Sequence, residues 1–330
     1  MRIGIDAMGG DNAPTEEVRG ALAARELLND GDRIVLVGDQ GRIEAELRTS
    51  DGWDEFITIA HAPEQIDMDE KPVEALRAKP DSSLNVLMQM HKRGEVDAVI
   101  SSGNTGATVA AAQMRLRRLR GVHRPGIAII TPTTNGPVAL SDVGANILCK
   151  PQHLHQYAVM SSIYVQVVAG ISNPRVGLLS VGEEDAKGNE LVKESRQLMK
   201  NDENLNFIGN LEGRDLFRGV CDVLVCDGFV GNVILKLMEG MAGSVVKAIL
   251  KELISHMPQN VDKIMAATGS LISKYDFNEY GGAPLLGVDG ICIICHGATD
   301  QTGIKNAVRS AYELIDQNMN DRISNLLLQS

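Results

Sequence analysis

The stretch "RIGIDAMGGDNAPTEEVRGALAARELLNDGDRIVLVG", residues 2–38, decides the fold class of this 330-residue chain. An aliphatic run of strand length opens it, a Gly-rich turn follows, and a second aliphatic run closes it. Between the two runs we predict a helix over 14–29. Pro14 followed by Glu16 and Glu17 is typical of a helix start, because proline fits the first turn and acids favour the positive end of the helix dipole. A strand, a helix and a strand in this order favour parallel pairing.

The same alternation continues along the whole chain. Further strands are predicted at 56–60, 97–101, 126–131, 138–143, 175–180, 206–209, 222–226, 284–288 and 291–295. Further helices are predicted at 82–93, 104–120, 151–169, 190–200, 229–256 and 300–318. No linker or repeat divides the sequence. The pattern predicts one α/β/α domain over 1–330, with a mostly parallel sheet covered by helices on both faces.

Composition excludes several classes of protein. The formal net charge is -11, and no basic stripe with interleaved aromatic residues is present, which argues against a nucleic-acid partner. No apolar run of about 18 residues and no apolar signal core occur, so we expect a cytoplasmic protein. The stretch "CIICH" matches a haem-attachment spacing, but strand alternation places Cys292 and Cys295 on opposite faces. We expect neither metal nor cofactor.

Six polar turns follow predicted strands and indicate a ligand site. They read "DAMGGDNAP", "SSGNTGA", "SDVGAN", "SVGEEDAKGN", "CDGFVGN" and "CHGATD". Glycines allow close approach to a ligand, and helix N-termini offer unpaired N–H groups to anions. We expect these turns to meet at one edge of the sheet, at the carboxyl ends of its strands. No G-x-G-x-x-G, P-loop or G-x-S-x-G motif is present, so direct displacement is favoured over covalent catalysis.

The segment 229–275 departs from the strand–helix alternation. Apolar pairs recur there every four residues, so the apolar stripe winds around the helix and different faces must be buried along its length. Pro258 ends the first helix, and a shorter second helix follows. We predict a projecting helical hairpin that forms a dimer contact; an ordinary core helix is the alternative.

A local basic surface is predicted after the second polar turn. No Asp or Glu lies between Asp97 and Asp142, and the predicted helix 104–120 ends in four arginines, with His123 and Arg124 just beyond. On a helical wheel these arginines lie outside the apolar stripe and should face solvent as a dock for an acidic partner. Simple complementation of the helix dipole is the alternative.

Together, "GIDAMGGDNAP", "SSGNTGA", "SDVGAN", "GEEDAKGNE", "DGFVGNVILK" and "GGAPLLGVDGICIICHGA" resemble the bacterial acyl-[acyl-carrier-protein]:phosphate acyltransferases of phospholipid synthesis. The resemblance spans essentially the whole chain; Ser102 replaces the commoner Ala of the second motif. It implies a homodimer with a fold similar to phosphotransacetylases and isocitrate-dehydrogenase-like proteins. It also implies transfer of a fatty acyl group from acyl carrier protein to inorganic phosphate. The acyl phosphate would then pass to a membrane glycerol-3-phosphate acyltransferase, which makes peripheral membrane contact a further expectation.

The expected site residues fall into three groups. The expected catalytic residues are Lys187, Asp227, His296, Asn104 and Asp142. Expected at the phosphate and thioester are Asp6, Gly10, Asp11, Asn12, Gly103, Thr105, Asn146 and Asn232. The carrier dock is expected to comprise Arg115, Arg117, Arg118, Arg120 and Arg124. For the asparagines, helix capping is a competing explanation.

Three other functions stay open at the level of sequence. A phosphotransacetylase-like enzyme would use coenzyme A as the acyl carrier, and an assay with both donors distinguishes it. An NAD-dependent dehydrogenase of the isocitrate-dehydrogenase-like fold would need metal-binding aspartates and would reduce NAD with a hydroxy acid. A non-catalytic carrier-binding scaffold would explain the arginines but not the six polar turns.

Overall fold

A computed structural model describes residues 1–48, 50–274 and 280–328. Its eleven described strands form one sheet in the order β3-β2-β1-β4-β11-β10-β5-β6-β9-β7-β8. The strands are β1 (Arg2–Asp6), β2 (Arg33–Gly38), β3 (Ile57–His61), β4 (Ala98–Ser101), β5 (Gly126–Thr133), β6 (Gly136–Ser141), β7 (Arg175–Leu179), β8 (Asn206–Leu211), β9 (Val223–Val225), β10 (Ala283–Leu286) and β11 (Ile291–Ile294). Each predicted strand is found within about two residues of its expected bounds. Most of the strands are runs of buried aliphatic side chains, whereas β3 and β8 are only partly buried.

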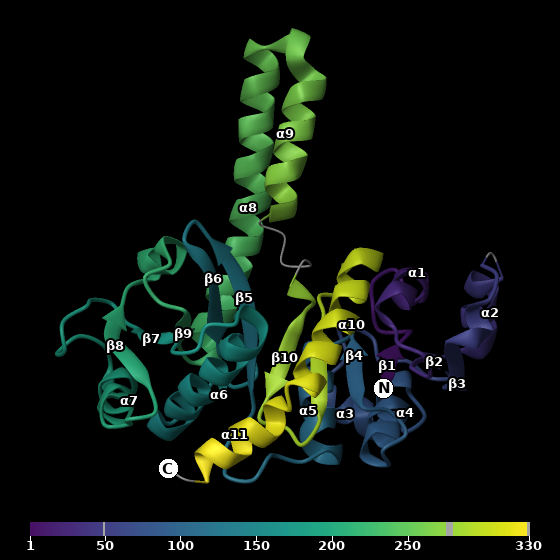
Figure 1. The fold of residues 1–330 in the computed structure, drawn as a ribbon, viewed down its shortest axis with the longest axis horizontal. Coiled ribbons are helices and arrows are strands. Elements are labelled where there is room, and N and C mark those ends of the chain that lie inside the picture. The colour runs from purple at the N-terminus through teal and green to yellow at the C-terminus, as the bar shows by residue number, and fades with distance from the viewer. Residues whose placement is uncertain (49, 275–279, 329–330) are drawn as a thin grey trace.

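Two parallel half-sheets make up this sheet. One half holds β1, β2, β3, β4 and β11, and the other holds β6, β7, β8 and β9. Between them, β10 pairs antiparallel with both β11 and β5, and β5 pairs antiparallel with β6. Three antiparallel steps reverse the direction, so the two halves run in opposite senses (Figure 1).

The prediction that all six polar turns share one sheet edge is therefore wrong. Three turns follow strands of the first half and three follow strands of the second. The register nevertheless brings the two groups together. At the end of β11, Ile294 pairs with Ala283 of β10. At the end of β6, Ser141 pairs with Ala128 of β5, and the next residue of β5, Ile127, pairs with Leu285 of β10. Measured along the strand direction, the carboxyl ends of β11 and β6 therefore lie within about two residues, roughly 7 Å, of each other.

Helices cover both faces of the sheet, which confirms the predicted three-layer α/β/α architecture. One apolar core packs beneath α1, α2, α6, α7, α10 and α11, and a second beneath α3, α4, α5 and the base of α8. Cys295 belongs to the first core and Cys292 to the second, as the alternation predicted. The helices are α1 (Thr15–Ala23), α2 (Gln40–Leu47), α3 (Pro72–Ala78), α4 (Ser83–Lys92), α5 (Thr105–Arg115), α6 (Pro151–Ala169), α7 (Glu190–Lys200), α8 (Gly228–His256), α9 (Val261–Lys274), α10 (Gln301–Asp316) and α11 (Met319–Leu327).

The predicted helix 104–120 is too long. Helix α5 ends at Arg115, and Arg117 adopts a left-handed conformation with φ of 70°. The chain then pairs with the segment after β10: Arg118 forms a bridge to Val288, and the N–H of Leu119 donates to Gly287 over 3.0 Å. The arginines beyond 115 therefore lie on an extended loop. Sequence also missed the short helices α2, α3 and α11.

Helices α8 and α9 form a hairpin that projects from the body of the molecule (Figure 1). Its bounds agree with the predicted hairpin 229–275, except that residue 275 lies outside the described residues. Along α8 runs an apolar row of about half-exposed side chains, four residues apart: Phe229, Val233, Leu237, Met241, Val245 and Ile249. No helix in the described part of the chain is long and apolar enough to cross a membrane.

Candidate active site

A cavity of about 390 Å³ lies where the two half-sheets meet. Its walls come from the start of α5, from the end of β11 and the turn that follows it, from β5 and β10, from the turn after β6, from the base of α8 and from the start of α10. One part of the lining is aliphatic, with Ile127, Ile129, Ile130, Val143, Leu235 and Ile294. Another part is polar, with Thr105, Asn232, Lys236, Glu239, His296 and Thr299. Three expected site residues are thus brought together: Thr105, Asn232 and His296.

Lys236 is the only lysine or arginine among the described residues that line this cavity. Its Nζ lies 2.8 Å from Oε2 of Glu239 and 3.3 Å from Nε2 of His296. The His296 ring is held from behind, because Nδ1 accepts the N–H of Ala298 over 3.2 Å. A cation, an imidazole and a carboxylate therefore share the polar end of the cavity.

Lys236 and Glu239 are not among the site residues predicted from the sequence. Asn232, Lys236 and Glu239 are spaced i, i+4 and i+7 in α8, so they lie on one face of the helix. That polar face starts at the last residue of the turn "CDGFVGN". A polar stripe continuing from a Gly-rich turn into the first turns of a helix was the signal in the sequence.

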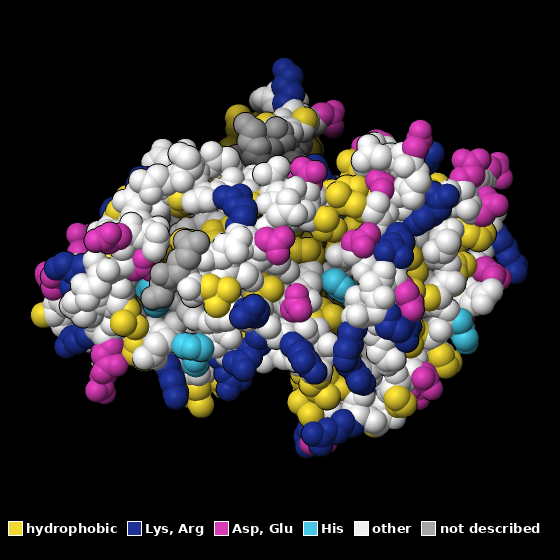
Figure 2. Space-filling model, turned by 60° about the horizontal axis from the view of Figure 1, so that its bottom comes forward, with side chains coloured by type: hydrophobic (Ala, Val, Ile, Leu, Met, Phe, Trp, Pro, Cys, Tyr) yellow, Lys and Arg dark blue, Asp and Glu magenta, His cyan; other side chains and the backbone are white. Residues whose placement is uncertain are grey.

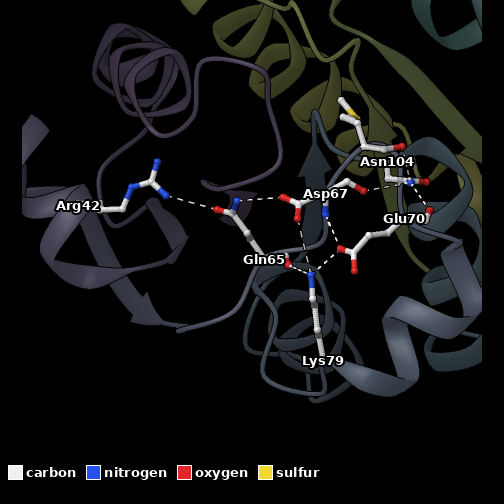
Figure 3. A network of polar contacts seen from close by, with 7 residues as sticks. Arg42, Gln65, Asp67, Glu70, Lys79 and Asn104 are labelled. Carbon is white, nitrogen blue, oxygen red and sulfur yellow. Dashed lines mark hydrogen bonds and ion pairs between the residues drawn. The ribbon is translucent and has the colours of Figure 1, made fainter.

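Asn104 caps α5 and also holds a loop in place. Its Oδ1 accepts the N–H of Ala107 over 3.0 Å, and its Nδ2 donates to the carbonyls of Asp67, Met68 and Glu70 (Figure 3). The side chain is fully engaged with the protein, which supports the capping explanation. Thr105, the first residue of α5, lies on the cavity wall.

Asp142 and Asn146 form the buried base of the turn after β6. The Asp142 carboxylate accepts four backbone N–H groups, from Ile127, Gly144, Ala145 and Asn146. Burial raises its pKa, and the four donors oppose that rise. The Asn146 amide donates to the carbonyl of Pro125 and to the hydroxyl of Tyr157. Both side chains order the turn that carries Gly144 to the cavity.

Asp227 begins α8 and positions its cavity face. Its Oδ1 accepts the N–H groups of Phe229 and Val230 over 3.0 and 3.1 Å. Gly231 packs so closely that a Cβ there would lie 1.9 Å from the carbonyl oxygen of Asp142. This close approach seats the base of α8 against the turn after β6, with Asn232 beside Gly144.

The turns after β1, β4 and β11 pack against one another. A Cβ on Gly9 would lie 2.7 Å from the N of Gly103, and the N–H of Asp11 donates to Gly297, next to His296. Asp11 and Asn12 are exposed, whereas Asp6 is buried and accepts the hydroxyl of Ser101 over 2.8 Å. Burial raises the pKa of Asp6.

Glu17, predicted from the sequence only as part of a helix start, is buried below the Gly10 turn. Its Oε1 accepts the hydroxyl of Ser102 over 2.6 Å, and its Oε2 has no hydrogen-bond partner among the described residues. Burial, with a smaller contribution from the charge of Asp6, raises its pKa to about 7. A Cβ on Gly10 would lie 2.3 Å from Oε1 of Glu17, so a larger residue there would have to displace this carboxyl group.

Lys187 is not brought to this cavity. It lies exposed on the loop after β7, in the outer part of the second half-sheet. Its N–H donates to Glu184 over 2.9 Å, which makes a local turn. A role for Lys187 in catalysis stays a prediction.

The expected carrier dock is a loop surface rather than a helix face. Arg117, Arg118, Arg120 and Arg124 are exposed and Arg115 is half-buried. Arg118 donates to the carbonyl of His123, which ties the two ends of the loop together. Figure 2 brings the lower side of Figure 1 forward, and Lys and Arg side chains gather across the lower middle of that face. Among the described residues no group of three or more His, Cys, Asp or Glu could hold a metal ion.

Comparisons with known proteins agree with this architecture. Residues 1–322 match the model of the family described as "Fatty acid synthesis protein". The chain is 46% identical over its full length to a phosphate acyltransferase of Geotalea uraniireducens, covering 95% of that protein. It is 49% identical over 97% of its length to a phosphate acyltransferase of Desulforamulus reducens, again covering 95% of that protein.

The fold has solved counterparts. A phosphotransacetylase from Streptococcus pyogenes superposes with a TM-score of 0.64 at 15% identity, over 96% of this chain and 94% of that one. This likeness confirms the predicted phosphotransacetylase-like fold. The full-length matches at 46% and 49% identity define the family. The chain belongs to the fatty acid synthesis protein family, among the phosphate acyltransferases.

Proposed function

We propose that this protein transfers a fatty acyl group from acyl carrier protein to inorganic phosphate, giving an acyl phosphate for phospholipid synthesis. The observation that carries the proposal is the full-length match to phosphate acyltransferases. The cavity between the half-sheets supports it, because an acyl phosphate joins an apolar chain to a dianionic group. The aliphatic lining suits the acyl chain, and the end that holds Lys236 and His296 suits the phosphate.

The reaction needs no covalent enzyme intermediate. An oxygen of hydrogenphosphate attacks the thioester carbonyl, the new C–O bond forms, and the C–S bond breaks with its electron pair on sulfur. The proton given up by the hydrogenphosphate ends on the leaving thiol. Because a thiol has a pKa of about 8.5, little acid assistance is needed. Positioning two reactants in one cavity, and stabilising the carbonyl oxyanion with fixed donors, supply the acceleration.

Charge favours a protein carrier over coenzyme A. The exposed arginines of residues 115–124 lie on a loop with no acid nearby in the sequence, although the chain carries a net charge of -11. Acidic carrier proteins would be attracted to such a surface, and steering of this kind raises the rate of encounter. We further propose a cytoplasmic homodimer whose apolar row is covered by the same row of a second copy. Peripheral contact with the membrane would hand the product to a membrane glycerol-3-phosphate acyltransferase.

The test is to incubate the protein with inorganic phosphate and either palmitoyl carrier protein or palmitoyl-coenzyme A. We expect acyl phosphate, trapped as the hydroxamate, together with free carrier thiol, and a higher kcat/KM with the carrier protein. Equal or better turnover with coenzyme A would assign a phosphotransacetylase-like donor. Absence of acyl phosphate with either donor would contradict the proposed reaction.

A further inference from the structure

The His296 ring faces two donors but can accept from only one of them. Its Nδ1 lies 3.2 Å from the backbone nitrogen of Ala298, and its Nε2 lies 3.3 Å from Nζ of Lys236. A neutral imidazole has one acceptor nitrogen, and a backbone N–H can only donate. Nδ1 is therefore the acceptor and Nε2 carries the hydrogen. A protonated ring would carry hydrogens on both nitrogens.

The Nε2–H of His296 thus meets the ammonium of Lys236, which also only donates. Two donors 3.3 Å apart do not satisfy each other, and because both side chains are exposed, either solvent or an anionic ligand can supply the acceptor that they share. An oxygen atom about 2.8–3.0 Å from each nitrogen would satisfy both, since such a triangle has ordinary hydrogen-bond lengths. The contact has the geometry of a two-donor clamp for an anion.

A third donor lines the same cavity. Thr299 is 4% exposed, and its hydroxyl has no hydrogen-bond partner among the described residues. Its N–H donates to the carbonyl of His296 over 2.9 Å, so the turn after β11 carries both side chains. A buried hydroxyl without a hydrogen-bond partner costs free energy unless a ligand supplies that partner. The unsatisfied hydroxyl is independent of the Lys236 contact and points to the same kind of ligand.

Glu239 acts on this clamp only through Lys236. Its Oε2 takes one of the three ammonium hydrogens over 2.8 Å, which leaves the others for a ligand. Glu239 is therefore a positioning residue, and the ligand contacts are those of Lys236, His296 and Thr299.

We propose that Lys236 and His296 clamp one oxygen of the attacking inorganic phosphate, with Thr299 as a further donor. The assignment rests on the proposed acyl transfer to phosphate for its role in catalysis. The phosphodiester of the carrier's prosthetic arm has the same anionic chemistry, and the measurements below separate the two sources. The clamp holds the nucleophile at one end of the cavity, beside the aliphatic lining that would receive the acyl chain.

Four variants test the clamp: Lys236→Met, His296→Phe, His296→Gln and, as a control, Lys247→Met. The Gln amide can still donate near the position of Nε2, whereas Phe cannot. Lys247 is exposed on the same helix and does not line the cavity. Binding is measured with sodium phosphate alone by titration calorimetry, against sodium chloride at equal ionic strength. The KM for phosphate and the KM for palmitoyl carrier protein are measured separately.

We expect Lys236→Met and His296→Phe to weaken phosphate binding and raise the phosphate KM by about tenfold to a hundredfold. The carrier KM should stay near that of wild type. His296→Gln should recover part of the loss, and Lys247→Met should match wild type. Because Lys236 and His296 are exposed, circular dichroism should show all variants folded.

Two outcomes would overturn the clamp: unchanged phosphate binding in Lys236→Met and His296→Phe, or a raised carrier KM with an unchanged phosphate KM. The second would assign the two residues to the carrier's phosphodiester. If wild type binds phosphate through Lys236 and His296 but forms no acyl phosphate, the clamp stands and the proposed reaction fails.

Discussion

Glu17, on α1, places a titrating group beneath the Gly10 turn of the first half-sheet. Its pKa is raised from an ordinary value of 4.5 to about 7, chiefly by burial. Between these values the folded chain keeps the proton and the unfolded chain releases it. The folded state therefore binds more protons, and its stability falls as the pH rises through this window. The loss is complete about one pH unit above the raised pKa and amounts to roughly 3–4 kcal/mol.

We predict that Glu17→Gln removes this loss, because the amide is neutral at every pH. The measurement is the free energy of unfolding in urea between about pH 5 and pH 8. Wild type should lose stability across the range, and Glu17→Gln should lose distinctly less. Glu74→Gln, with an exposed side chain on α3, serves as the control and should follow wild type. Identical slopes for wild type and Glu17→Gln would show that Glu17 is ionised throughout.

Asn104 gives a second prediction at the scale of one residue. Asn104→Ala should lower stability by more than the roughly 1 kcal/mol of a lost helix cap, because it also frees the carbonyls of Asp67, Met68 and Glu70. Asn189→Ala is the matched control: Asn189 caps α7 through a hydrogen bond to Val192. Chemical denaturation of both variants checks this, and equal losses would mean that the loop contacts contribute nothing. A lower rate at unchanged stability would instead favour a catalytic role.

At the scale of the elements, the end of helix α5 could not be predicted from the sequence. Arginine and leucine are good helix formers, so residues 116–120 read as a continued helix. The chain leaves the helix because Arg118 and Leu119 find backbone partners in the segment after β10. Those partners lie about 170 residues away in the sequence, and local propensity carries no information about them. Leu116 and Leu119 are nevertheless buried.

For the site, sequence predicted the turns better than the side chains that line the cavity. Gly-rich turns after strands can be recognised locally, and Thr105, Asn232 and His296 were found that way. Lys236 was missed because a lysine inside an amphipathic helix is usually a solvated surface residue. Its proximity to His296 depends on how α8 leaves the second half-sheet and meets the end of the first. Only the arrangement of the two half-sheets reveals that contact.

The arginine loop yields a prediction for carrier recognition. Charge reversal at Arg115 and Arg118 should raise the KM for acyl carrier protein, and the effect should shrink with added salt, since exposed charges are screened over about 8–10 Å. The KM for phosphate should hardly change. Reversal at Arg48 and Lys200, two exposed cations elsewhere, changes the net charge equally and should leave the carrier KM near wild type. An unaltered carrier KM at low salt in the Arg115 and Arg118 variant would leave dipole complementation as the explanation.

At the scale of the molecule, the fold places one cavity between two half-sheets of opposite direction. The central strands β5 and β10 create this reversal, and the turns that end β11 and β6 become neighbours because of it. Each half supplies groups that the other lacks: His296 and Thr105 come from the first, and Gly144 and the base of α8 from the second. A change in the packing between the two half-sheets would therefore alter the shape of the cavity even if every lining residue were kept.

The hairpin gives the prediction for assembly. Val245 and Ile249 are each 49% exposed in the protomer, so replacing both with Asp should leave the fold intact. In a dimer the same change buries unpaired charge, and we expect a monomer by sedimentation velocity. Lys247→Ala lies between them on α8 and should sediment as wild type. A soluble dimer of the double variant would place the contact elsewhere.

The four-residue spacing of the apolar row has a consequence for how two hairpins could meet. Every fourth residue of a helix forms a ridge inclined by about 26° to the helix axis, so the row from Phe229 to Ile249 runs obliquely along α8. When two such ridges interlock, the helix axes cross at about -50°. Two copies of α8 would thus form an open X, with the hairpin tips diverging beyond the crossing point. Spin labels at the tips should then lie much farther apart than spin labels at the middle of the row.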